Sequence, residues 1–168
     1  MSQQVGAAYL EEALRVFRQY KLLGEKAMAQ LEPAGLFQTL NDESNSIAII
    51  VKHLAGNMRS RWTDFLTTDG EKPDRNRDDE FELSAGTTAA DVHRWWEDGW
   101  RLVFAALEPL GPDDLLRTVT IRGEPHSVLQ AIDRQVAHYA YHIGQIVQLA
   151  RHLSGERWQS LSIPKRRR

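Results

Sequence analysis

The stretch QVAHYAYHIGQIVQLARHL, residues 135–153, decides the fold of this chain. Apolar residues recur in it every three or four positions, which is the period of a helix that buries one face. Two histidines, His138 and His142, interrupt this apolar pattern four positions apart. Residues at that spacing project from the same face of a helix, about 6 Å apart along its axis. Packing alone does not require two imidazoles on such a face, so their partner must come from elsewhere in the chain.

Length and composition limit the classes of protein that this chain can belong to. Its 168 residues, 42% of them hydrophobic, are enough for one substantial core. We expect a single domain over residues 1–160 and a basic, disordered tail over residues 161–168. The formal net charge of -2 gives no general attraction for nucleic acid or for an anionic membrane. Because the chain has no cysteine, metal ligands must come from histidine, aspartate and glutamate.

The terminal segments and the apolar runs give no sign of export or membrane insertion. Residues 1–17 lack the apolar core of a signal peptide, and no segment approaches the ~20 apolar residues of a membrane span. The basic residues 165–168 have no interleaved aromatic side chains, which a nucleic-acid-binding segment would be expected to carry. We therefore expect a cytoplasmic protein with no nucleic-acid partner and no membrane partner.

Helical periodicity occurs in four segments of the chain. We expect helices over residues 8–31, from about 45 to 65, from 88 to about 108, and from 128 to 154. Residues 115–127, LLRTVTIRGEPHS, alternate β-branched residues before a glycine turn, which predicts a short hairpin. This order is typical of an all-α four-helix bundle with one decorated connection. In such bundles, metal sites are built from inward side chains on facing helices.

A third histidine, His53, lies on the second predicted helix and completes a candidate metal site with His138 and His142. It belongs to a polar stripe, with Ser46 and Asn57, that runs beside the apolar ridge. Three imidazoles from two facing helices suit Zn²⁺ or Ni²⁺ and leave at least one coordination position open, which is typical of catalytic sites. By spacing alone, the same stripe could be a solvated edge of the helix, and that alternative stays open here.

Several polar residues near these histidines are candidates for contacting a ligand imidazole or a substrate. They are Asn57, Gln135, Gln145, Arg59 and Arg61. Either arginine could hold a carboxylate of an anionic substrate, and spacing does not decide between the two. The remaining histidines lie in the exposed first turn of the third helix, in the hairpin and near the end of the fourth helix, and we expect them to lie outside the site. They are His93, His126 and His152.

The connection over residues 67–87 is long for a compact domain, and such a loop is usually either functional or disordered. Its charged residues, which include Arg75, Arg77 and Glu80, alternate in sign densely enough to pair with the helices. Phe81 could anchor the far end of the loop. The alternative is a solvated linker whose charges only maintain solubility.

The tryptophans of RWWEDGW, residues 94–100, predict both core packing and a subunit contact. Trp95 fits the apolar stripe of the third helix. Trp96 and Trp100 would then turn partly outward, and exposed aromatic residues at such spacing are typical of a protein interface. We therefore expect a homodimer.

Two segments carry a resemblance to a known family. They are SIAIIVKHLAGNMRSRWTDFLTTDGEKPDRNRDDEFE, residues 46–82, and HYAYHIGQIV, residues 138–147. Through them nearly the whole chain resembles the DinB superfamily of metal-binding bundles. The resemblance implies an up-down-down-up bundle in which His53, His138 and His142 bind the metal. It also implies a relationship to enzymes that activate a low-molecular-weight thiol, such as bacillithiol or mycothiol, and to proteins that resemble hydrolases.

Two classes of function remain from the sequence. The first is an enzyme that acts on a small molecule, with a metal-bound water or thiolate as its nucleophile. Thiol S-transfer is favoured over hydrolysis, because metal coordination itself converts a thiol into a thiolate. Hydrolysis would need a general base, and neither helix places a carboxylate beside a proposed ligand, so Glu80 or Asp64 would have to come from nearby. The second class is a non-catalytic ligand-binding or stress-related protein of the same fold.

Overall fold

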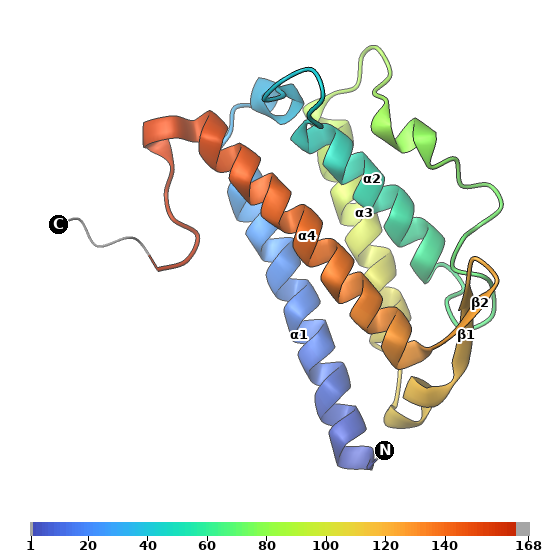
Figure 1. Cartoon of the computed structure of the whole chain (residues 1–168). Coiled ribbons are helices and arrows are strands. Elements are labelled where there is room, and N and C mark those ends of the chain that lie inside the picture. The colour runs from blue at the N-terminus through green and yellow to red at the C-terminus, as the bar shows by residue number, and fades with distance from the viewer. Residues whose placement is uncertain (1, 164–168) are drawn as a thin grey trace.

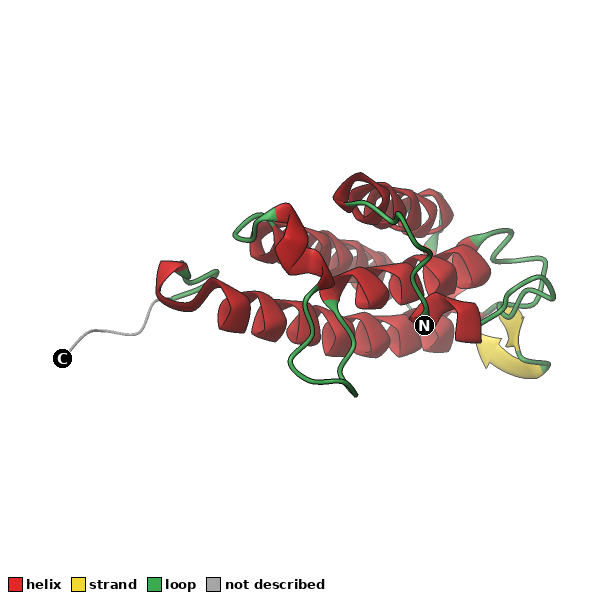
Figure 2. Cartoon of the chain, turned by 90° about the horizontal axis from the view of Figure 1, so that it is seen from above, coloured by secondary structure: helices red, strands yellow, loops and turns green. Residues whose placement is uncertain are grey.

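The computed structural model describes residues 2–163, and within them the chain is mostly helical, with one small sheet (Figures 1 and 2). The four long helices are α1 (Gln3–Met28), α2 (Ile47–Trp62), α3 (Ala89–Leu107) and α4 (Val128–Ser154). The sheet is a hairpin of β1 (Thr118–Ile121) and β2 (Glu124–Ser127). The predicted helical class and the hairpin before the last helix are thus confirmed. Most of the predicted basic tail, residues 164–168, lies outside the described residues.

Local capping signals explain where the helices begin. Ser46, Thr88 and Ser127 each accept a hydrogen bond from a backbone N–H in the first turn of α2, α3 and α4. Thr88 and Asp91 form a capping box, because the carboxylate of Asp91 in turn accepts a hydrogen bond from the backbone N–H of Thr88. Helix α1 begins earlier than predicted because Ser2 caps its first turn in the same way. None of the described helices is both long and apolar enough to cross a membrane.

The core lies between the helices, with α2 packed most extensively on α3 and α1 on α4. Its centre is an aromatic cluster around Phe17 of α1. The ring centroids of Trp62, Trp100 and Tyr139 lie 6.2, 6.3 and 5.7 Å from that of Phe17. These contacts connect all four helices through one buried group of rings, which holds α2 and α4 beside each other.

The prediction for the tryptophans of α3 was wrong. Trp96 and Trp100 are 2% and 0% exposed, whereas Trp95 is partly exposed and has the ammonium of Lys52 5.9 Å from its ring centroid. Trp96 fits into the core because a Cβ on Gly24 of α1 would overlap its ring. Since Trp96 and Trp100 are buried within one chain, they cannot form the predicted subunit contact.

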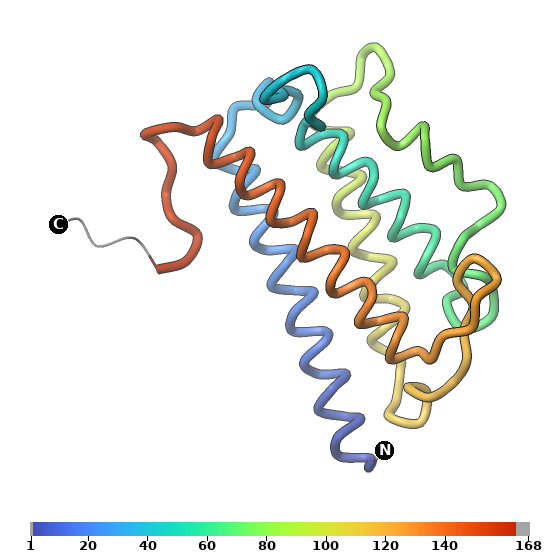
Figure 3. The backbone as a smooth tube through the Cα atoms, in the orientation of Figure 1, coloured from blue at the N-terminus to red at the C-terminus, as the bar shows by residue number. Residues whose placement is uncertain are grey.

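The loop after α2 first contacts the hairpin, and the loop then turns back and runs along α2 (Figure 3). Arg122 and Gly123 form the hairpin turn with φ angles of 57° and 75°. The carboxylate of Asp69 accepts hydrogen bonds from both of their backbone N–H groups, at 2.8 and 2.7 Å. Backbone hydrogen bonds from Glu71 and Gly123 lower the pKa of Asp69 to about 2, so this carboxylate stays ionised. The hairpin turn is thereby placed at one end of the space between α2 and α4.

Candidate metal centre

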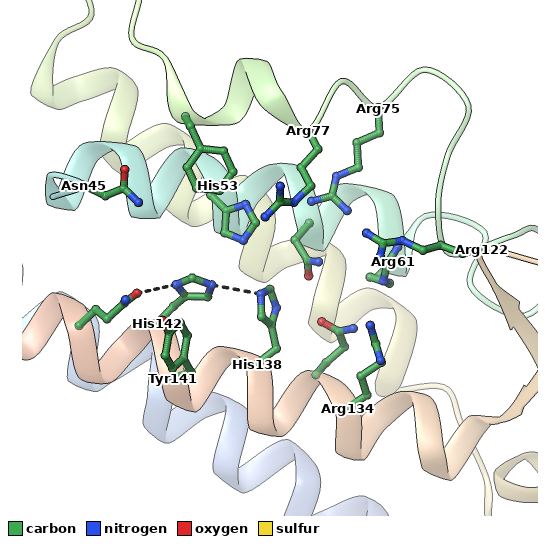
Figure 4. A pocket seen from close by; sticks show the side chains of 14 residues that line it. Asn45, His53, Arg61, Arg75, Arg77, Arg122, Arg134, His138, Tyr141 and His142 are labelled. Carbon is green, nitrogen blue, oxygen red and sulfur yellow. Dashed lines mark hydrogen bonds between the residues drawn. The ribbon is translucent and has the colours of Figure 1, made fainter. Parts of the chain in front are cut away.

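Three histidines from two helices converge between α2 and α4 (Figure 4). His53 comes from α2, and His138 and His142 come from successive turns of α4. Their candidate ligand atoms all lie within 4.8 Å of one another, and the Nε2 atoms of His138 and His142 are 3.1 Å apart. Two nitrogens bound to a tetrahedral zinc ion at about 2.0–2.1 Å would lie roughly 3.3 Å apart. The pair on α4 therefore has the spacing of a chelate, and the three-histidine group could hold a metal ion.

Hydrogen bonds on the far side of two rings determine which nitrogen can bind a metal. Nδ1 of His142 donates to Oε1 of Gln145 at 2.8 Å, and Nδ1 of His53 donates to Oε2 of Glu80 at 2.8 Å. An amide oxygen and a carboxylate only accept, so each Nδ1 carries a proton and Nε2 is the atom of each ring that could bind a metal. Such outer hydrogen bonds orient metal-binding histidines in proteins generally. The donor set therefore fits a resident metal ion.

Burial also favours the protonation state that a ligand histidine needs. Burial, together with the neighbouring His142 and His53, lowers the pKa of His138 to about 3. Burial lowers the pKa of His142 as well, although its hydrogen bond to Gln145 opposes the shift. Only a neutral imidazole offers a lone pair to a metal. Both members of the pair on α4 are therefore neutral, and able to ligate, at neutral pH.

Glu80 supports His53 from behind. It lies in the short 3-10 helix η2 (Asp78–Phe81), is 6% exposed, and accepts hydrogen bonds from Nε and Nη2 of Arg75 at 2.7 and 2.9 Å. Burial alone would raise the pKa of Glu80, but hydrogen bonds from His53 and Arg75 lower it. A Cβ on Gly56 would overlap this carboxylate, so a glycine on α2 makes room for it. Glu80 is therefore an ionised group that positions His53, and it is not free to act as a general base.

The loop segment around Glu80 is fixed to α2 on both of its sides. Lys52 of α2 donates to the backbone carbonyls of Asp79 and Glu82 at 2.6 and 2.7 Å. Phe81 stacks on the ring of His53, with centroids 4.9 Å apart and planes 29° apart. The predictions that this loop pairs with the helices and that Phe81 anchors it are confirmed. A fully solvated linker is the wrong description of this segment.

A cavity of about 710 Å³ lies beside the three histidines. Its lining residues are Asn45, His53, Asn57, Arg61, Arg75, Arg77, Phe81, Arg122, Arg134, Gln135, His138, Tyr141, His142 and Gln145. Four of the five residues predicted to line the site are present, and Arg59 is the exception. Its exposed guanidinium pairs with Asp74 at 3.1 Å on the other side of α2. The reason is geometric, because residues two positions apart on a helix point about 200° apart, so Arg59 and Arg61 face opposite sides.

A hydrogen-bonded chain connects the cavity with the aromatic core. Nε1 of Trp62 donates to the hydroxyl of Tyr139 at 2.8 Å, and that hydroxyl donates to Oδ1 of Asn57 at 3.2 Å. All three side chains are buried. The position of Asn57 in the cavity wall is therefore set by core residues of α2 and α4.

Sequence reasoning missed several cavity residues. They are Asn45, Arg122, Arg134 and Tyr141, together with the exact placement of Arg75 and Arg77. One signal could have found Arg134, because it precedes His138 by four positions on the same helix and so shares its face. Arg122 had no such signal, since its place depends on how the hairpin packs. As predicted, His93, His126 and His152 lie outside the three-histidine group found among the described residues.

The comparisons with known proteins give one family and no individual relative. The model of a family described as a protein of unknown function (DUF1572) matches residues 4–167. This range covers nearly the whole chain and includes all three histidines and the loop that packs on α2. No curated protein and no solved structure was found to match the chain.

Proposed function

This chain belongs to the DUF1572 family of unknown function, and we propose that it is a metal-dependent enzyme that transfers a small thiol to an electrophilic substrate. The observation that carries the proposal is the convergence of His53, His138 and His142 beside a cavity. Three protein ligands would leave an open position on a tetrahedral ion, which is the arrangement of catalytic sites. Three imidazole donors suit zinc, nickel or another borderline divalent ion, and the proposal takes zinc or nickel.

The same features support kinship with the DinB-like bundles. The candidate ligands come from the second and fourth helices, as that resemblance implies, and a hairpin precedes the fourth helix. The packing of α1 on α4 and of α2 on α3 supports an up-down-down-up bundle. We further propose that the protein is a cytoplasmic homodimer, and that residues other than Trp96 and Trp100 form the subunit contact.

In the proposed reaction, the sulfur of a thiol R–SH bonds to a carbon of an electrophile R′–X. The C–X bond breaks, X leaves with the bonding electron pair, and the thiol proton passes to solvent. A bound divalent ion would supply the positive charge that lowers the pKa of the thiol. The chain itself orients the imidazoles through Glu80 and Gln145 and encloses the reactants in a cavity of about 710 Å³. That volume lies within the range of about 300–1,000 Å³ typical of small-molecule sites.

The pairing of Glu80 favours thiol transfer over hydrolysis. Glu80 is hydrogen-bonded to His53 and doubly to Arg75. No aspartate or glutamate within residues 2–163 lies in the group of candidate ligands or lines the cavity. Hydrolysis needs a base that takes a proton from water in the transition state. Thiol transfer places a smaller demand on the protein, because the thiol is already the stronger acid.

The experiment compares turnover and metal content in the same preparations. Protein loaded with zinc or nickel is assayed with a low-molecular-weight thiol and an alkyl halide, and separately with ester and amide substrates. We expect thiol transfer that a chelator abolishes and that re-added metal restores. His53→Ala should lower the rate more than it lowers metal content, because His138 and His142 still hold the ion, whereas His93→Ala should change neither.

Two outcomes would count against the proposal. Turnover that persists in the presence of chelator would remove the metal from the reaction. The absence of turnover in every assay, together with tight small-molecule binding in the cavity, would favour the non-catalytic ligand-binding protein instead. Within residues 2–163 no free carboxylate lies beside the histidines, and this observation favours the non-catalytic ligand-binding protein as the second candidate.

A further inference from the structure

The cavity beside the three histidines is strongly cationic at one end. Five arginines line it, and no aspartate or glutamate among residues 2–163 does. In Figure 4, Arg61, Arg122 and Arg134 lie on one side of the histidines, whereas Asn45 lies on the other. A ligand that enters the cavity therefore meets positive charge at one end and a neutral polar group at the other.

The surrounding carboxylates neutralise only part of this charge. Glu71 is shared by three guanidinium groups, those of Arg61 at 3.0 Å, Arg75 at 3.2 Å and Arg122 at 3.0 Å. Glu80 pairs with Arg75 as well. One shared carboxylate cannot satisfy three cations, so positive charge remains around Arg61 and Arg122.

Two further arginines have no carboxylate partner within the described part of the chain. Arg77 lies with its guanidinium 5.0 Å from the ring centroid of Phe81, and Arg134 extends from the exposed face of α4. Neither forms an ion pair with a residue between positions 2 and 163, although both line the cavity. They come from opposite walls of the cavity, since one belongs to the loop on α2 and the other to α4.

Two of the residues that line the cavity have buried polar atoms that lack a hydrogen-bond partner in the described part of the chain. Nε of Arg61 and Oε1 of Gln135 have no hydrogen-bond partner among the described residues, and the two side chains belong to residues only 4% and 2% exposed. Buried polar atoms are normally hydrogen-bonded, because an unmade bond there leaves the loss of hydration uncompensated. The guanidinium of Arg61 is therefore only partly satisfied by its protein partners, and its strongest hydrogen bonds are those to charged acceptors.

We propose that the substrate is a small organic anion whose carboxylate or phosphate group lies among Arg61, Arg77, Arg122 and Arg134. Its reacting group then faces His53, His138 and His142. The planar guanidinium group binds both kinds of acid through paired hydrogen bonds, which a neutral group cannot match. The identity of the reacting centre rests on the proposed function, whereas the binding of the anion needs only the arginines.

The test is isothermal titration at low ionic strength with succinate and with glycerol 3-phosphate. Succinamide and glycerol serve as their uncharged counterparts. We expect at least one anion to bind and both neutral compounds to fail. Arg77→Ala and Arg134→Ala should each weaken anion binding about 10-fold, because each removes a charge-assisted hydrogen-bond donor from an exposed position. Arg134→Lys should recover part of the loss, and Arg151→Ala, on the same helix but outside the cavity, should leave binding unchanged.

The outcomes separate the two acids and the two proposals. Binding of succinate alone assigns a carboxylate, and binding of glycerol 3-phosphate alone assigns a phosphate. Failure of both anions to bind, or equal binding by wild type, Arg77→Ala and Arg134→Ala, overturns the inference. Each titration is repeated with chelator, with zinc and with nickel, and metal content is measured in parallel. Protein that binds the anion but neither metal would overturn the proposed function and leave the anion site standing.

Discussion

Two neighbouring residues of α4, Tyr139 and His138, lie in regions of opposite character. Tyr139 is 0% exposed, its ring packs against Phe17 and Trp100, and its hydroxyl is hydrogen-bonded to Trp62 and Asn57. His138 faces the cavity, and the polar partner of its ring within the described chain is His142. The face of α4 that carries Tyr139, the aromatic face, is closed by apolar packing. The face that carries His138 and His142, the histidine face, presents nitrogen atoms to a space that a ligand can enter.

This difference assigns stability and chemistry to separate faces of one helix. The aromatic face stabilises the folded chain because its apolar area is buried against the other helices. The histidine face depends on charged side chains from α2, the loop and the hairpin, and these groups orient imidazoles more than they stabilise the fold. Substitutions on the two faces should therefore have different consequences.

The largest expected effect is a loss of stability on the aromatic face. Trp100→Ala should lower the free energy of unfolding by about 3–5 kcal/mol, because it leaves a large cavity in the centre of the core. Trp95→Ala, on the same helix but partly exposed, should cost far less. Urea denaturation of both variants measures the difference. Equal losses would show that the core face of α3 has been assigned wrongly.

On the histidine face, the expected loss is in metal affinity. The double substitution His138→Ala and His142→Ala should weaken metal binding more than about 100-fold, since even residues behind a ligand contribute 10–100-fold. Single alanine substitutions of His93, His126 and His152 serve as controls and should retain the metal. Elemental analysis after dialysis measures occupancy. Full retention of metal by the double variant would remove these histidines from the site.

Glu80 tests whether the charged loop acts on the metal through His53. Glu80→Gln removes the charge that holds Nδ1–H of His53, and it should lower metal affinity about 10–100-fold while the helices remain folded. Asp79→Asn is a matched control, because Asp79 is exposed and its contact with α2 uses its backbone carbonyl. Affinity is measured by competition with a coloured chelator. Equal affinities in the two variants would reduce Glu80 to a packing role.

In the metal-free protein, the histidine face should make the stability depend on pH, whereas the aromatic face has no group that titrates in this range. The pKa of His138 is lowered to about 3, so between that value and about 6.5 the unfolded chain binds a proton that the folded chain does not. Stability is therefore fully present above about pH 6.5 and falls as the pH drops below it. His138→Gln should flatten this slope between about pH 6.5 and 5, where carboxylates remain ionised. Unfolding curves recorded at each pH, with chelator present, measure how the stability depends on pH. An unchanged slope in His138→Gln would contradict the lowered pKa of His138.

Arg59→Ala should have the smallest effect. Its ion pair with Asp74 is exposed, and such pairs contribute about 0–1 kcal/mol. Metal content and anion binding should not change, because Arg59 lies outside the cavity. Arg61→Ala, by contrast, removes a buried guanidinium that pairs with Glu71 and should impair anion binding. Similar effects of the two substitutions would refute the placement of the cationic end.

Features set within a few residues of each other could be predicted from the sequence. The helix starts at Ser46, Thr88 and Ser127 follow from capping hydrogen bonds that span three positions. The hairpin follows from a turn at Arg122 and Gly123 between alternating residues. The shared face of His138 and His142 follows from helical geometry alone. In each case the interaction that decides the outcome lies within one turn or one hairpin.

The tertiary structure decided everything that depends on how distant segments meet. Trp96 points inward because Gly24, on another helix, leaves room for its ring. His53 is a supported ligand because the path of the loop brings Glu80 to its Nδ1 atom. The cationic end of the cavity gathers arginines from α2, the loop, the hairpin and α4, and no spacing along the chain predicts that meeting. Local periodicity determines which side of its own helix a residue occupies, but only packing determines what lies opposite.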